Sequence, residues 1–129
     1  MFSFSQKNID SLKLIINNTS DNKIISEACL ELSYEYSSFE KEEILGYLNK
    51  GIKASLEIND HNITADLYYM KAILFDYHEE WITSKDIYYQ SAKYYYLIND
   101  SVNLGKCYIN TGLTNYFYGN FALAEKEYK

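Results

Sequence analysis

The chain repeats part of itself at an offset of forty residues, and this repeat constrains the fold more than any other feature. The tripeptide Ile58-Asn59-Asp60 recurs as Ile98-Asn99-Asp100. The other matched pairs are Leu48 with Tyr88, Ile52 with Ala92, Ala65 with Gly105, Tyr68 with Tyr108, Ala72 with Gly112, Trp81 with Phe121 and Tyr88 with Tyr128. The first copy needs a one-residue slip around Phe39. A fixed period with two helices per unit is typical of an α-solenoid, in which neighbouring units bury each other's apolar faces.

The composition predicts an all-α fold in one domain. The 129 residues include no proline and only five glycines, so helix breakers are scarce. Apolar residues make up 47% of the chain, which is enough to bury a core. The 15 tyrosines suit half-buried positions between helices, because tyrosine has an apolar ring and a polar tip. In the run Tyr94-Tyr95-Tyr96 the rings point about 100° apart on a helix, so we expect at least one to be buried and one exposed.

Apolar residues three and four apart, together with turn clusters, predict the helices. The expected helices cover 6–17, 22–37, 41–58, 63–77 and 81–98, and another begins near Ser101. Turns are expected at 17–21, 37–39, 59–62 and 119–120, with Ser20 or Asp21 as a cap for the second helix. The expected buried faces are Ile9, Leu12 and Ile16; Ile25, Ala28, Cys29, Leu32 and Tyr36; Ile44, Leu45, Leu48, Ile52 and Leu56; Ala65, Leu67, Tyr68, Ala72 and Phe75; and Trp81, Ser84, Ile87, Tyr88, Ala92 and Tyr95.

The repeats divide a single domain over residues 1–129 into four parts. These are a leading helix and turn (6–21), a degenerate first repeat (22–60), a second repeat (61–100) and a truncated third repeat (101–129). The last part presents Phe121, Leu123 and Tyr128 on a helix with no following unit. An exposed apolar edge favours self-association, so we expect the chain either to pair through this C-terminal repeat or to fray there.

The pattern of small and aromatic residues resembles the tetratricopeptide repeat. The third unit shows it as Tyr108, Gly112, Phe121, Ala124 and Tyr128, and the second as Tyr68, Ala72, Phe75, Trp81, Ser84 and Tyr88. The first unit, with Cys29, Ser33 and Tyr36, is degenerate. The resemblance covers about residues 22–129 and implies a right-handed superhelix of stacked helical hairpins. It departs from the family in its period, forty instead of 34 residues, and in the missing terminal proline.

Long repeats of this kind look like those in the N-terminal sensor or regulatory arms of bacterial signalling proteins. The resemblance therefore implies a non-catalytic scaffold that binds a protein or peptide. Two other functions stay open: a cytoplasmic regulator that binds a small signalling peptide and switches an output domain, and a purely structural oligomerisation module.

In this family the first helix of each unit lines an inner groove. Carried over, the groove residues are Glu27, Leu30 and Tyr34; Asp66, Tyr69, Ile73, Asp76 and Tyr77; and Lys106, Ile109, Leu113, Tyr116 and Phe117. They predict a groove with aromatic walls and an acidic entrance. Members that bind chaperones grip a terminal carboxylate with basic and amide side chains, and only Lys106 keeps such a charge here, so that role is not expected.

Charge and motifs argue against several other functions. All 12 basic residues are lysines and the net charge is −6, so a nucleic-acid surface is not expected. We find no phosphate loop or nucleophile elbow and expect neither an enzyme nor a bound cofactor. His61 and His78 fall in predicted turns, where they do not converge with enough ligands for a metal site.

The cysteines and the chain start leave the compartment open. Cys29 and Cys107 lie on apolar helix faces 78 residues apart, close to two repeat lengths. Equivalent positions two repeats apart should lie too far from each other in space for a disulfide, so we expect buried free thiols. No apolar run approaches the roughly 18 residues of a membrane span. The start at residues 1–6 is either the remnant of a removed leader, which places the chain outside the cytoplasm, or a native N-terminus, which leaves it cytoplasmic.

Overall fold

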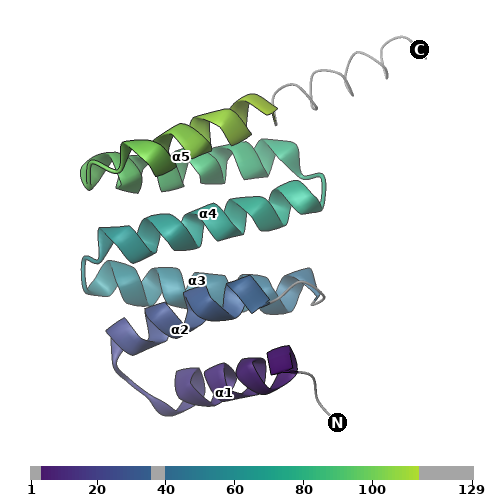
Figure 1. Cartoon of the computed structure of the whole chain (residues 1–129), viewed down its shortest axis with the longest axis vertical. Coiled ribbons are helices and arrows are strands. Elements are labelled where there is room, and N and C mark those ends of the chain that lie inside the picture. Colours follow the sequence, from purple (N-terminus) through teal and green to yellow (C-terminus); the bar gives the residue numbers. More distant parts are fainter. Residues whose placement is uncertain (1–3, 36–39, 114–129) are drawn as a thin grey trace, which may run out of the picture.

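The computed structural model describes residues 4–35 and 40–113, and these residues form helices joined by short turns. The elements are α1 (Phe4–Asn18), α2 (Asn22–Glu35), α3 (Lys41–Glu57), α4 (His61–Tyr77) and α5 (Trp81–Leu97), and residues 101–113 are helical as well. Successive helices run antiparallel, with α1 at one end of the stack and residues 101–113 at the other (Figure 1). No β-strand occurs in these two ranges, and the prediction of an all-α fold is confirmed.

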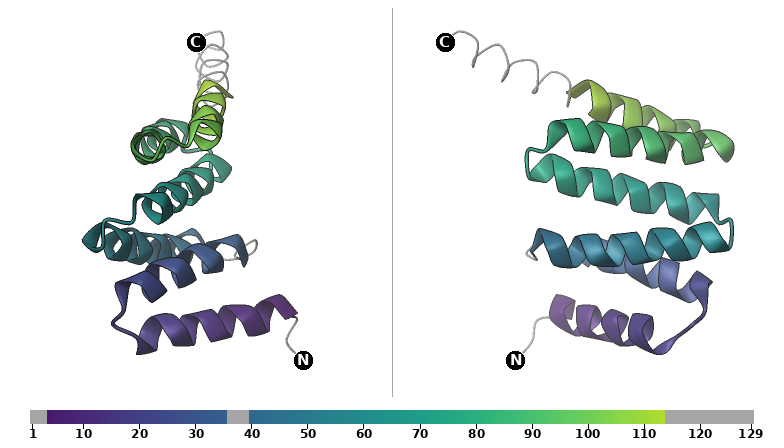
Figure 2. Two further views of the ribbon diagram at one scale, coloured as in Figure 1. Left: turned by 60° about the vertical axis from the view of Figure 1, so that its left-hand side comes forward. Right: turned by 180° about the vertical axis from the view of Figure 1, so that it is seen from behind.

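The helices pack as pairs that stack on one another. The most extensive contacts join α4 to α5 and α2 to α3, while α3 also packs on α4 and α1 on α2. In Figure 1, α2 lies in front of α3, and residues 101–113 lie in front of α5. The views from the side and from behind show the same stack (Figure 2). α2 also contacts α4 directly. This is the arrangement expected of a helical repeat.

The core follows most of the predicted apolar stripes, but four residues expected in them are only half-buried: Leu45, Tyr68, Phe75 and Trp81. Ile9, Leu12 and Ile16 of α1 are buried, as are Leu32, Leu48, Leu67 and Tyr88 further along the chain. Leu56 was expected in the buried face of α3, but its side chain is 39% exposed. It lies in the last turn of α3, one residue before the helix ends at Glu57. The predicted burial of Tyr36 and the predicted turns at 37–39 and 119–120 concern residues outside the described ranges.

One turn geometry recurs every twenty residues, at half the period seen in the sequence. Asn59, Glu79 and Asn99 each have a positive φ, of 54°, 60° and 58°. The N–H of the next residue in each turn donates to a carbonyl five residues back, at 3.0, 2.9 and 3.0 Å. This pattern closes a helix C-terminus. The middle turn was not recognised as a copy because its sequence is His78-Glu79-Glu80 instead of Ile-Asn-Asp.

The turn at Asp60 also corrects the predicted start of the fourth helix. Residues 59–62 were expected to form a turn, but α4 begins at His61. Asp60 is its N-cap, and its carboxylate accepts the backbone N–H of Ile63 at 3.2 Å. A carboxylate at this position satisfies one of the otherwise unpaired donors of the first helical turn. Asp21 caps α2 in the same way, accepting from the N–H groups of Lys23 and Ile24.

We expect Glu79→Gly to stabilise the protein by about 1 kcal/mol. Glu79 has a positive φ, which costs a residue with a Cβ atom energy that glycine avoids. Glu79→Ala is the matched control, because alanine removes the same carboxylate and keeps the strain. Chemical denaturation of the three proteins checks the prediction. Equal midpoints for the glycine and alanine variants would show that the charge, and not the backbone, determines stability at this turn.

Small side chains let α4 and α5 approach closely. Ala65 and Ala72 of α4 are completely buried, and so are Ser84 and Ser91 of α5. The Ser91 hydroxyl donates to the carbonyl oxygen of Ala65 at 2.8 Å, and Ser84 donates to that of Ala72 at 2.9 Å. These hydroxyls hold the two helices in register, since each bond joins a side chain of one helix to the backbone of the other.

Candidate functional site

The described members of the predicted groove come from α2, α4 and residues 101–113. α2 contacts α4, and Asn110 donates a hydrogen bond to Tyr69 of α4. Apart from the adjacent pair Asp76 and Tyr77, the members recur three or four residues apart on each helix, a spacing that keeps them on one face of that helix. We call this surface the candidate groove face; its described members are Glu27, Leu30, Tyr34, Asp66, Tyr69, Ile73, Asp76, Tyr77, Lys106, Ile109 and Leu113. The other two predicted members, Tyr116 and Phe117, lie outside the described residues.

Much of the candidate groove face is exposed and apolar. The exposed fractions are 60% for Tyr34, 38% for Ile73, 82% for Tyr77, 64% for Ile109 and 51% for Leu113. Exposed apolar side chains of this size on three neighbouring helices form the type of surface that proteins use for contacts with other molecules.

Tyr69 differs from its neighbours because it holds helices together. Its ring packs edge-on against Tyr88 of α5, with 5.6 Å between the ring centroids. Its hydroxyl accepts a hydrogen bond from the side-chain amide of Asn110 at 2.6 Å. Tyr69 therefore joins α4 both to α5 and to the helical residues 101–113. Of the α4 residues on this face, Ile73 and Tyr77 are the ones that present apolar surface to solvent.

A half-buried carboxylate, Asp66, forms the centre of a cluster drawn from three helices. The Tyr95 hydroxyl of α5 donates to Asp66 Oδ1 at 2.5 Å. Burial raises the pKa of Asp66, and the nearby carboxylates of Asp100 and Asp60 raise it further, against the opposing effect of the Tyr95 hydrogen bond. Tyr34 of α2 belongs to the same cluster, because burial and the charge of Asp66 together raise its pKa. Asp66 therefore interacts electrostatically with side chains of both α2 and α5.

Tyr95 was not among the predicted groove residues, since it lies on the second helix of its unit. The tyrosine run was the available signal, and its expected division is confirmed: Tyr95 is 2% exposed and Tyr96 is 71% exposed. Tyr94 is half-buried, and its ring stacks on that of Tyr68 at 5.8 Å. Periodicity indicated that Tyr95 is buried, but only the packing of α5 on α4 shows that its hydroxyl reaches Asp66.

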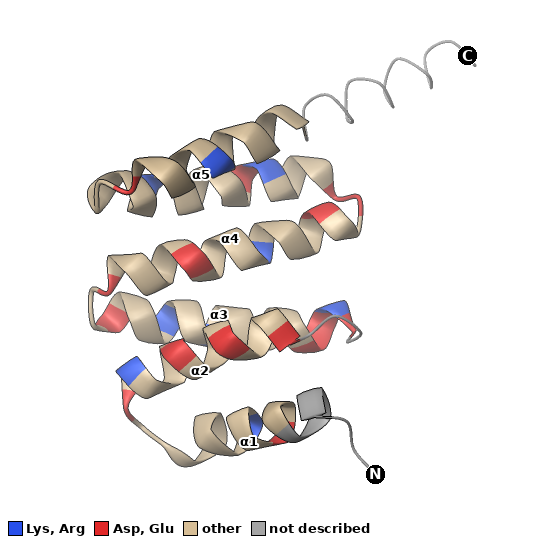
Figure 3. Cartoon of the chain, viewed as in Figure 1, with Lys and Arg blue, Asp and Glu red and all other residues tan. Residues whose placement is uncertain are grey.

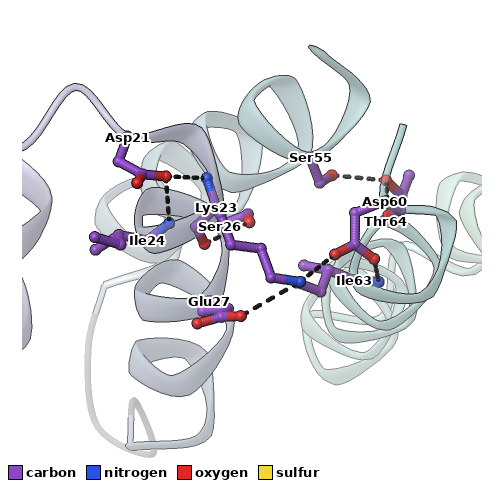
Figure 4. Close-up of polar contacts among 9 residues, drawn as sticks. All are labelled: Asp21, Lys23, Ile24, Ser26, Glu27, Ser55, Asp60, Ile63 and Thr64. Atoms are coloured by element: carbon purple, nitrogen blue, oxygen red, sulfur yellow. Dashed lines mark hydrogen bonds and ion pairs between the residues drawn. The ribbon is translucent and has the colours of Figure 1, made fainter. Parts of the chain in front are cut away.

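At the end of α2 nearest Asp60, a lysine already pairs with the carboxylates around it. Lys23 Nζ lies 2.5 Å from Asp60 Oδ2 and 3.4 Å from Glu27 Oε1 (Figure 4). Burial acts to raise the pKa of Asp60, but the hydrogen bonds from Lys23 and from the Ile63 N–H lower it more. Asp60 and Asp66 are thus perturbed in opposite directions, because only Asp60 has a lysine beside it.

We expect Asp66→Asn to stabilise the protein at pH 7 and to lose this advantage in acid. The pKa of Asp66 is higher in the folded protein than its unfolded value of about 4. Ionised Asp66 therefore destabilises the folded protein at high pH, whereas below about pH 4 the group is protonated in both states and has no such effect. The wild type therefore gains on the variant as the pH falls from 7 to 4. Denaturation of both proteins across this range measures the effect, and a constant difference would contradict it.

Both cysteines lie in the interior of the protein. Cys29 and Cys107 are buried free thiols, as predicted. Burial raises the pKa of Cys29 to about 11 and also raises that of Cys107.

His61 is the first residue of α4, not part of a turn, and its ring lies 5.6 Å from that of Tyr94. Within residues 4–35 and 40–113, no three or more His, Cys, Asp or Glu side chains are placed to hold a metal ion. In the same part of the chain, no helix combines the length and apolarity that crossing a membrane requires.

The chain was compared with family models, with curated proteins and with solved structures, and none of them matches it.

Proposed function

We propose that this chain is a non-catalytic scaffold of the tetratricopeptide type, which binds a protein or peptide on the candidate groove face. We further propose that it acts as the sensor or regulatory arm of a larger bacterial signalling protein. The observation that supports binding is the row Tyr34, Ile73 and Leu113. These side chains lie 39 and 40 residues apart, at equivalent places on α2, α4 and residues 101–113. All three are exposed, although each is large and apolar.

Two further observations agree with a binding role. Neither cysteine suits a nucleophile, because both thiols are buried and their pKa values are raised. The helices beneath the face are joined by buried hydrogen bonds, such as that from Ser91 to the Ala65 carbonyl, so the surface is held in one shape. A surface that is ordered before binding has less conformational entropy to lose when a partner docks.

Site-specific photocrosslinking in cells that produce the full protein tests the proposal. With p-benzoylphenylalanine in place of Tyr77, which is 82% exposed, we expect a discrete adduct with one partner protein. The same probe in place of Tyr96 is the matched control, since that residue is 71% exposed but lies on α5. The adduct should be lost in the Ile73→Ser background. An adduct formed equally from both positions, or one that survives Ile73→Ser, would contradict binding on this face.

A further inference from the structure

The candidate groove face carries negative charge that lysines of the chain leave unbalanced. Acidic positions line α2 and α4 on the side toward the viewer in Figure 3. Glu27 pairs with Lys23 at 3.4 Å, and both side chains are more than half exposed, so this pair neutralises the surface only weakly. Lys23 lies closer to Asp60, at 2.5 Å. Its charge is thus used mainly at the turn before α4, away from the middle of the face.

Asp66 and Asp76 carry most of this unbalanced charge. Within the described part of the chain, neither carboxylate forms an ion pair with a lysine. Asp66 accepts one hydrogen bond at Oδ1, from Tyr95, and the nearby carboxylates of Asp60 and Asp100 repel it. A half-buried carboxylate among other carboxylates is unfavourable until a cation approaches it. Lys106 belongs to the same face, but within the described residues it forms no ion pair with either carboxylate, and its charge acts on Asp100. A basic group of a partner could therefore relieve the charge of Asp66 and Asp76.

Apolar side chains flank these two carboxylates. Ile73 lies between Asp66 and Asp76 on the same face of α4, and Tyr77 follows Asp76. Across the direct contact between α2 and α4, the Tyr34 ring is 60% exposed, and the charge of Asp66 acts on it. A basic side chain that approaches Asp66 would therefore meet an aromatic ring as well as a carboxylate, and both attract a cation.

We propose that the face binds a polypeptide segment in which lysine or arginine alternates with apolar side chains. The basic residues pair with Asp66 and Asp76, and the apolar residues cover Tyr34, Ile73 and Tyr77. This inference rests on the proposed function, because it names the chemistry of the partner for the same surface. Charge complementarity selects this occupant over a second copy of the chain, whose net charge of −6 would repel an acidic face.

Two labelled synthetic peptides of twelve residues test the charge. Both have the same leucine and tyrosine positions, and one carries lysine where the other carries glutamate. In fluorescence anisotropy at low salt we expect the lysine peptide to bind at least tenfold more tightly. The difference should shrink as salt is raised, since exposed charges are screened. If neither peptide binds at millimolar protein, both this inference and the proposed face are overturned.

Variants assign the effect to particular side chains. Asp66→Asn combined with Asp76→Asn should weaken the lysine peptide about tenfold and leave the glutamate peptide no weaker. Glu42→Gln with Asp86→Asn is the matched control, because it removes two exposed carboxylates from α3 and α5. If the control weakens the lysine peptide equally, general charge and not this face attracts it, and the inference fails.

Ile73→Ser separates the inference from the function on which it rests. It should weaken the lysine peptide through the apolar contacts while leaving both carboxylates in place. If the two peptides bind equally and both are weakened by Ile73→Ser, the basic partner is overturned and the docking face remains. Circular dichroism of each variant verifies that the helices are intact.

Discussion

Gly51→Ala is expected to destabilise the protein by about 2 kcal/mol, the typical cost of overpacking a core, and to lower its melting temperature by roughly 8 °C. Gly51 is buried in α3. A Cβ atom added there would lie 2.7 Å from Cys29 Cβ of α2, and 3.1 and 3.2 Å from the two Leu67 Cδ atoms of α4. Leu67 can change rotamer, but Cys29 Cβ is fixed to the backbone, so α2 itself would have to move.

Gly46→Ala is the control for this effect, because it makes the same chemical change in the same helix. A Cβ atom at Gly46 meets nothing within 4 Å. We expect Gly46→Ala to stabilise the protein by about 0.5–1 kcal/mol, since glycine inside a helix costs that much relative to alanine. Urea denaturation of the two variants measures both effects. Changes of the same sign would show that helix propensity, and not the close approach of α2 to α3, decides the outcome at Gly51.

Tyr95→Phe is expected to destabilise the protein by about 2 kcal/mol at pH 7, because it removes the hydroxyl that donates to a charged acceptor. The loss leaves Asp66 half-buried without its hydrogen bond from Tyr95. Tyr96→Phe is the matched control: its side chain is 71% exposed, and we expect a change within about 0.5 kcal/mol.

A double-mutant cycle tests whether the acceptor's charge causes the effect. In the Asp66→Asn background, an amide oxygen can still accept from Tyr95, but the bond no longer involves an ion. The cost of Tyr95→Phe should then fall to about 1 kcal/mol, typical of a neutral hydrogen bond. An unchanged cost in this background would mean that the hydroxyl acts through packing and not through Asp66.

Local sequence was enough to locate the helices and the buried stripes. The third helix was predicted over 41–58 and spans Lys41–Glu57, and the fifth was predicted over 81–98 and spans Trp81–Leu97. These predictions succeed because apolar periodicity and Asn-Asp turns act over a few residues. The start of α4 was misplaced by two residues, since Asp60 caps the helix before His61. Burial was misjudged for Leu56 at a helix end, where periodicity does not show how far the neighbouring helix extends.

The groove residues illustrate how far a pattern reaches. Periodicity predicted that Tyr69 and Ile73 share one face of α4. It could not separate their roles: Tyr69 packs against Tyr88 and bonds to Asn110, whereas Ile73 is exposed. The difference depends on residues from α5 and from 101–113, whose distances from α4 are set by stacking.

Tertiary structure alone brought Tyr34, Asp66 and Tyr95 together, from helices whose residues lie about thirty positions apart in the chain. It also showed why position 51 is a glycine, since no local pattern reveals that Cys29 and Leu67 converge on it. Helix formation depends on interactions within a few residues, and the sequence displays them directly. The perturbed carboxylate and the close helix contact depend on how one helix lies against the next, which emerges only when the stack is assembled.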